Sequence, residues 1–310
     1  MKARNLVYLF ILFAFVLTSA YGSYKMLGSA KEFLLNREKY TEAVVLTEGI
    51  LDPVSWIPNG SWEEKVARAD VFKARSNRAH DSILKYGLWM SLIAFLLIVA
   101  PVILFLRNRV VWRYLAYSTL SIAVFALIIG VATPMMEMAA FNTDLTIPFN
   151  FSQAASDFPM LSSGMLELIS FDVTFEGRMY YFYQSKSIMG LIQILLSQGN
   201  YFVGIAILIF SLILPVTKLF CSFLQLFSTR FANNRIVFFI TNYLGKWSMA
   251  DVFVVALFLG YFSFANMNVG IETQTKPLFG LYCFASYVIL SLLSTHFINL
   301  CLKSESNNDK

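Results

Sequence analysis

The sequence predicts an all-α integral membrane protein with about six transmembrane helices. Apolar residues make up 57% of the 310 residues and charged residues only 14%, against about 25% charged in an average soluble chain. The apolar residues gather into six blocks that are long enough, or nearly so, to cross about 30 Å of hydrocarbon as helices. These blocks are Leu6–Tyr21, Gly87–Leu106, Leu115–Thr133, Tyr201–Phe227, Met249–Ala265 and Leu278–Leu302.

The first block has two interpretations. Lys2 and Arg4, a short apolar core and the small residues Thr18–Ala20 resemble a secretory signal with its cleavage site. The alternative, which we favour, is an uncleaved anchor. Cleavage after Ala20 would leave the remaining topology unchanged, because the new N-terminus would lie outside.

The polar segment Gly22–Lys85 predicts an extracytoplasmic helical hairpin. Its apolar residues partly follow a helical period, Gly49 can end the first helix, and Pro58–Gly60 favours a turn. Ser61 and Glu64 have the spacing of a capping box at the start of a second helix, which can continue into the second span.

A small mixed periplasmic loop region is expected in the other outer segment, Pro134–Gly199. Apolar residues alternate between Phe171 and Tyr183 around Glu176–Gly177, which predicts a small hairpin. The stretch Ser187–Gln198 has a helical period but is too short to span a membrane. It is therefore expected to lie in the plane of the outer head groups.

The distribution of charge predicts that both termini are cytoplasmic. The outer segment Pro134–Gly199 holds two basic residues against six acids. Basic residues dominate the segments on the other side of the membrane, where the N-terminus is expected. The net charge of +5 therefore reports topology and not nucleic-acid binding. The basic residues expected on the same side of the membrane as the N-terminus are Lys2, Arg4, Arg107, Arg109, Arg113, Arg230, Arg235, Lys246, Lys303 and Lys310.

The inventory of reactive side chains predicts no metal, no cofactor and no enzymatic site. Three cysteines, Cys221, Cys283 and Cys301, fall in predicted spans, and the histidines are His80 and His296. Neither a disulfide framework nor a zinc site can be assembled from them. The sequence also lacks a phosphate-binding loop of the Gly-x-x-x-x-Gly-Lys type.

Lys218 is the most unusual residue of the fourth span, since a lysine at the centre of a membrane costs roughly 2.5 to 3.5 kcal/mol unless it is paired or reaches the surface. It follows Pro215, which tends to kink the helix. One interpretation is that Lys218 reaches the cytoplasmic head groups. The other is an ion pair with Asp251, which lies at a comparable depth in the fifth span.

The start of the fifth span supplies the remaining leading candidates. Ser248 can cap the helix, Trp247 suits the membrane interface, and Asp251 favours the positive end of the helix dipole. Asp251 could therefore serve only its own helix. Candidates of lower rank are Lys246, Pro134, Glu137 and His296.

Three of these lower candidates, Pro134, Glu137 and His296, also have an ordinary structural interpretation. Pro134 ends the third span and turns the chain into the outer segment. Glu137, which follows it, could be a site residue, but a solvated loop acid is the more ordinary reading. His296 lies within the sixth span. The more ordinary interpretation is a histidine that faces a neighbouring helix and has its hydrogen bonds satisfied there.

The motifs of the C-terminal part, Trp112–Leu302, give a specific resemblance. Lys246–Ala256 reads Lys-Trp-Ser-Met-Ala-Asp-Val-Phe-Val-Val-Ala, which is similar to the Trp-Ser-Met-x-(Asp/Glu)-Val-Phe signature of the paraquat-inducible protein A (PqiA) family. Gln198–Tyr201, Leu214–Leu219 and Gly280–Tyr282 occur in that family's order and spacing.

The resemblance implies an inner-membrane component of Gram-negative envelope lipid transport. Such a component would load or pass phospholipid together with a periplasmic MCE-domain protein. It also implies three regions: an N-terminal pair of spans around the hairpin (1–111), a four-helix PqiA-like module (112–302) and a cytoplasmic tail (303–310). The chain departs from the family pattern because it lacks zinc-ribbon cysteines and has a single module.

Two other classes of function compete with this one. In a secondary transporter or channel for a small solute, Lys218 and Asp251 would couple ion and substrate movement. Against it, the spans hold few polar residues and no inverted repeat is evident. A membrane enzyme is the weakest alternative, because clusters of water-facing His, Asp and Glu are missing.

Overall fold

A computed structural model describes residues 2–45, 61–105, 110–150, 170–227, 239, 241, 256 and 272–306. Within these residues, five helices are long and apolar enough to cross a membrane, and three strands form a small sheet. The protein is thus a mostly helical multi-pass membrane protein, as predicted. The predicted fifth span, Met249–Ala265, lies almost entirely outside the described residues and stays a prediction.

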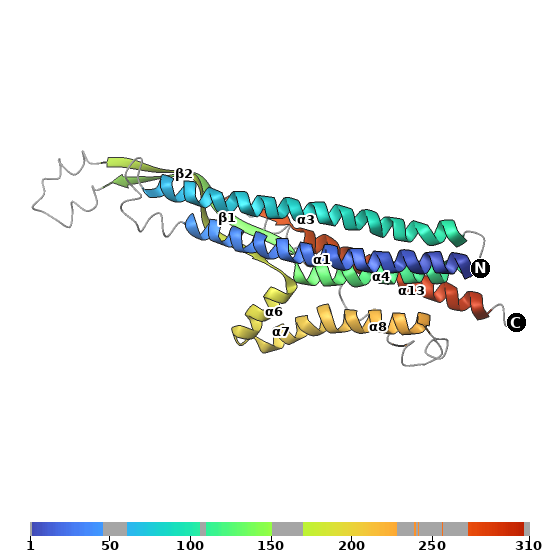
Figure 1. Cartoon of the computed structure of the whole chain (residues 1–310). Helices are drawn as coiled ribbons and strands as arrows, with labels where there is room; N and C mark the ends of the chain where they lie inside the picture. The colour runs from blue at the N-terminus through green and yellow to red at the C-terminus, as the bar shows by residue number, and fades with distance from the viewer. Residues whose placement is uncertain are drawn as a thin grey trace, which may run out of the picture.

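Two long helices form the predicted hairpin, α1 (Lys2–Ala43) and α3 (Ser61–Phe105). Each continues from its apolar span into the polar segment without a break, and the two lie side by side over their length (Figure 1). At 1.5 Å per residue, the polar parts extend about 33 Å and about 39 Å beyond the predicted spans. We call these parts, residues 22–43 and 61–86, together with strands β1 and β2, the stalk.

Helix α1 ends at Ala43, before the predicted stop at Gly49, because the next residues form hydrogen bonds with the sheet. The carbonyl oxygen of Val44 accepts a hydrogen bond of 3.0 Å from the backbone N–H of Tyr180. Val45 then forms a parallel bridge with the same residue. A carbonyl that bonds to a strand cannot also continue a helical ladder.

The sheet has the strand order β2-β1-β3 and is antiparallel, with β1 at Met136–Asn150, β2 at Ser170–Lys186 and β3 at Glu272–Pro277. The predicted hairpin within residues 171–183 is therefore wrong, since this stretch is part of one long strand. Gly177 has a φ of 96° and its N–H donates to Asp144 Oδ1 at 2.8 Å, where the register between β1 and β2 shifts. The glycine marks a bulge and not a turn.

Replacing Gly177 with alanine is expected to lower the free energy of unfolding by about 1 to 2 kcal/mol, because a left-handed conformation costs roughly that much for a residue with a Cβ. An added Cβ meets no atom within 4 Å, so backbone strain is the whole effect. Thermal unfolding in detergent measures it. Gly177→Asn is the control and should lose less, since asparagine tolerates this region better; equal losses would contradict the assignment.

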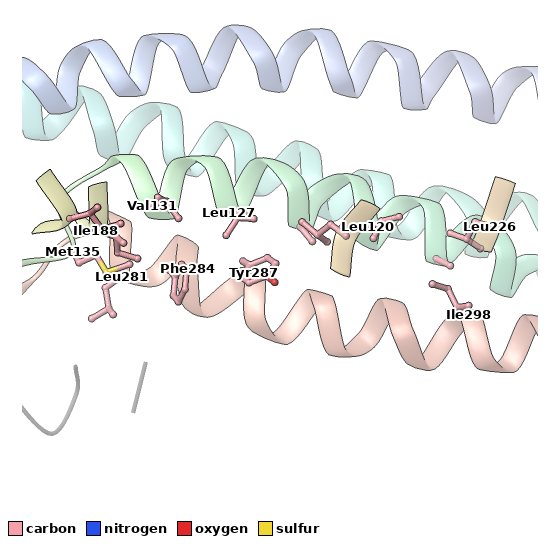
Figure 2. Close-up of a cluster of buried hydrophobic side chains, with 14 residues drawn as sticks. Leu120, Leu127, Val131, Met135, Ile188, Leu226, Leu281, Phe284, Tyr287 and Ile298 are labelled. Carbon is pink, nitrogen blue, oxygen red and sulfur yellow. The ribbon is translucent and has the colours of Figure 1, made fainter. Parts of the chain in front are cut away.

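Helix α4 (Val111–Ala132) is the centre of the membrane bundle and the most buried of the five candidate spans. It packs along α13 (Phe279–Ser306), and Figure 2 shows the labelled side chains that fill the space between the two helices. The shared cluster also takes side chains from α6 and α8. Its most buried members are Ala116, Leu120, Ala123, Leu281, Phe284, Tyr287 and Ile298.

The N-terminal helices pack directly on this bundle. Phe15, Leu97 and Ile122 form one buried cluster that joins α1, α3 and α4. The Tyr8 hydroxyl lies 2.9 Å from the Ser118 hydroxyl, and Tyr8 is 2% exposed. Whether the first span is an uncleaved anchor stays a prediction. The predicted boundary between residues 111 and 112 stays a prediction, because packing continues across it.

Both chain ends lie at one end of the molecule, and the sheet lies at the other (Figure 1). The long span made of α7 (Tyr201–Leu208), the π-helix η3 (Ile209–Ile213) and α8 (Leu214–Phe227) finishes at the end that holds the termini. β3 begins at the stalk end. The predicted fifth span falls in the sequence between these two points, outside the described residues.

Candidate functional site

The helix that carries Pro215 changes its hydrogen-bond pattern just before the proline. Residues Ile209–Ile213 form a π-helix, and the backbone N–H of Leu214 donates to the carbonyl of Ile209, five residues earlier. Proline has no N–H to donate, so the ladder is interrupted at this point. The π-helix thus lies directly before the proline at which the sequence predicts a kink, and such π-bulges are frequent at functional sites.

Lys218 lies one turn after this bulge and is only 5% exposed. It shares the buried face of α8 with Pro215, Ser222 and Gln225, whereas Val216 and other apolar residues occupy the exposed face. A lysine that reaches the head groups would keep its ammonium group accessible. Its burial therefore favours an interaction inside the protein.

The proposed partner of Lys218 lies outside the described residues. Asp251 and the preceding Lys246, Trp247 and Ser248 all fall there. The ion pair between Lys218 and Asp251 consequently stays a prediction.

A double-mutant cycle tests this pair. Lys218→Met and Asp251→Asn are each expected to lower the free energy of unfolding by about 3 kcal/mol, because each leaves one buried charge uncompensated. The double variant should lose less than the sum by at least about 0.5 kcal/mol. Unfolding in mixed micelles measures all three, with Lys303→Met, an exposed lysine of α13, as control. Strictly additive losses would rule the pair out.

Glu137 is buried in an ion pair, so the expectation of a solvated loop acid is wrong. It lies on β1 with 7% of its surface exposed. Arg37 of α1 donates from both Nε and Nη2 to Glu137 Oε1, at 3.0 Å and 2.7 Å. The segment after Pro134 is a strand that α1 covers, and this places the acid under the helix instead of in solvent.

Aromatic rings enclose the Arg37 guanidinium. Its central carbon lies 5.6 Å from the centre of the Tyr40 ring and 5.9 Å from that of Tyr183, within the range of cation–π attraction. Burial alone lowers the pKa of Arg37, but the adjacent Glu137 carboxylate outweighs it and the net pKa is raised. The ion pair joins α1 to β1, which makes it a structural clamp of the stalk.

Pro134 lies at the junction of α4, the sheet and α13. Helix α4 ends at Ala132, as the proline predicts. The Pro134 carbonyl accepts from the N–H of Gly280 at 3.2 Å, and the Met135 carbonyl accepts from Leu278 at 2.8 Å. The start of α13 is therefore anchored on the residues that end α4.

His296 lies on the exposed face of α13, with its ring tilted against Phe297 at 6.2 Å between ring centres. The expectation that it faces a neighbouring helix is wrong. The inward positions of this part of α13 are taken by Ser294 and Ile298 instead.

A groove that the sequence did not predict runs between α1 and the pair formed by β2 and α6 (Ile188–Ser197). Its volume is about 740 Å³. Helix α6 occupies the residues predicted for the amphipathic helix, and Ser187 caps it by accepting from the Gly190 N–H at 3.0 Å. Its placement relative to the head groups stays a prediction.

The groove is lined by both charged and apolar side chains. Lys31, Glu38 and Glu42 come from α1, and Lys186 comes from β2. Lys186 Nζ lies 3.8 Å from Glu38 Oε1. A second cavity of about 160 Å³ shares Lys186 and two neighbouring residues with the groove, and its wall includes three methionines, Met135, Met136 and Met138.

The fold and these features define a multi-pass membrane protein with a buried polar helix face and an extramembrane stalk. The family model described as paraquat-inducible protein A matches residues 174–301. The resemblance expected from the sequence is thereby confirmed for residues 174–301, which are similar to the PqiA family. No curated protein and no solved structure matches the chain.

The matched region depends on elements outside it. It begins within β2 and includes α6, α7, α8, β3 and most of α13. β2 and β3 both pair with β1, and α13 packs on α4. The described elements of the matched region thus form one packed unit together with α4 and β1, which precede the match.

Proposed function

We propose that this protein is a non-enzymatic inner-membrane component of an envelope lipid transport system, which loads or passes phospholipid with a periplasmic MCE-domain partner. The observation that carries the proposal is the stalk, joined to a membrane region of the PqiA family. A component that only conducts a solute across the bilayer has no need of a structure that extends so far beyond it.

The stalk has the properties of a docking arm. Its helices continue from the membrane bundle without interruption, so a contact at the sheet is transmitted to the spans. A buried cluster that includes Tyr40, Trp62, Phe175 and Tyr180 binds the two helices to the sheet. The excess of basic residues in the sequence segments predicted to be cytoplasmic supports a periplasmic location for the stalk.

Co-purification tests the partner. The full chain, expressed with the MCE-domain protein of the same genome, is expected to retain it in mild detergent, whereas a periplasmic protein without such a domain should not be retained. The chain should also carry phospholipid that photoactivatable lipids label. Absence of both the MCE-domain protein and lipid labelling would overturn the proposal.

A secondary transporter remains the second candidate, and the polar face of α8 favours it. Lys218 is buried beside a π-bulge in a span, an arrangement that suits coupling of ion and substrate movement. Liposomes that contain the purified chain alone distinguish the two functions. A solute flux that Lys218→Met abolishes would support the transporter, while no flux together with lipid transfer to the MCE-domain protein would support lipid transport.

A further inference from the structure

We propose that the groove between α1 and the β2–α6 pair binds a zwitterionic glycerophospholipid taken from the leaflet at the stalk end. This inference rests on the proposed function for the direction in which the lipid moves, which is out of the membrane. The binding itself is a property of this chain alone. Position, charge and polarity of the lining each support it.

One end of the groove lies close to the predicted spans. One end is lined by Ala132, the last residue of α4, and by Leu27, a short distance beyond the predicted first span that ends at Tyr21. The other end is lined by Val45 and Tyr180, far along the stalk. From Leu27 to the end of α1 at Ala43 the helical rise amounts to about 24 Å. A lipid can therefore enter from the leaflet and move outward.

The charged side chains of the groove match a head group with one charge of each sign. Lys31 and Lys186 can bind a phosphate, and Glu38 and Glu42 can bind an ammonium group. These four charges sum to zero. An anionic head group would meet two carboxylates without offering them a cation, so the lining favours the zwitterion.

The uncharged lining suits the rest of an amphiphile. Leu34 of α1 and Met189 of α6 supply apolar surface along the groove. The adjoining methionine-lined cavity adds adaptable apolar space.

Site-specific photo-crosslinking tests the inference on the full-length chain. A benzophenone amino acid is placed at Leu34, which lines the groove, or at Leu35, which is 54% exposed and does not line it. Both positions lie about 20 Å beyond Tyr21 along α1, out of reach of the bilayer. In vesicles of equal parts phosphatidylethanolamine and phosphatidylglycerol, lipid adducts at Leu34 are expected to exceed those at Leu35 at least fivefold.

A groove-filling variant provides the second measurement. Gln193 lines the groove and is exposed, whereas Ser197 is exposed on the same helix but does not line it. Gln193→Trp should reduce the adducts at Leu34 at least fivefold, and Ser197→Trp should leave them unchanged. Since both side chains are exposed, neither variant is expected to unfold the protein, and size-exclusion elution verifies this. Equal labelling at Leu34 and Leu35, or no effect of Gln193→Trp, would overturn the site.

The lipid recovered in the adducts tests the head-group class. Wild type should yield mainly phosphatidylethanolamine, and Glu38→Gln/Glu42→Gln should shift the recovery severalfold toward phosphatidylglycerol. A wild-type preference for phosphatidylglycerol would overturn the zwitterionic assignment. These measurements need no partner protein, so they separate this inference from the proposed function. Loss of lipid labelling in the groove while the MCE-domain protein is retained would contradict the groove alone, and the opposite result would contradict the partner alone.

Discussion

Arg37→Met is expected to lower the free energy of unfolding by about 3 to 5 kcal/mol, because it leaves the Glu137 carboxylate buried without its counter-charge. The two side chains are 11% and 9% exposed and are joined at 2.7 Å. Glu137→Met should cost a similar amount for the opposite reason. The double variant, Arg37→Met/Glu137→Met, should recover most of the loss, since apolar side chains of similar volume often replace a buried pair without penalty.

Glu38→Gln is the matched control, one residue further along α1. Glu38 pairs with Lys186 at 3.8 Å, but the side chains are 55% and 37% exposed. An exposed pair of this kind contributes between about 0 and 1 kcal/mol. Unfolding in mixed micelles compares the four variants. If Arg37→Met is no more harmful than Glu38→Gln, the buried pair is not the clamp that joins α1 to β1.

The five spans among the described residues and the helical hairpin were predictable because their signals are local. An apolar block of about twenty residues is recognisable without its neighbours. The sheet was misread for the opposite reason. Alternation in residues 171–183 is the same for a hairpin and for one strand, and only the partner strand β1 decides between them. That partner lies far upstream in the sequence.

The sites divide in the same way. Pro134 follows the end of α4, as anticipated, and Pro215 follows a π-helix in its own span. The partner of Glu137 is Arg37, separated from it by 100 residues, and the groove joins residues of α1 to residues of β2 and α6. One local signal for the clamp did exist. Arg37 lies in the buried stripe of α1 formed by Met26, Ala30, Phe33, Tyr40 and Val44, where a lone charge requires a partner.

Gly280→Val is expected to lower the free energy of unfolding by about 3 kcal/mol, at the upper end of what overpacking costs. A Cβ at this position would lie 2.6 Å from the Pro134 carbonyl oxygen and 2.7 Å from that of Thr133. Both atoms belong to backbone, which cannot move aside as a flexible side chain can. Separation of α13 from the end of α4 would also break the hydrogen bond from Gly280 to Pro134.

Gly28→Ala on α1 is the control for this prediction, because a Cβ there meets no atom within 4 Å. It should raise the stability by about 0.5 to 1 kcal/mol, the gain of alanine over glycine within a helix. Opposite signs at the two glycines, measured by unfolding in mixed micelles, would assign the loss to the contact at the junction and not to glycine chemistry in general. A neutral Gly280→Val would mean that α13 begins without support from Pro134, and the Gly280–Tyr282 motif would then need an explanation other than close packing.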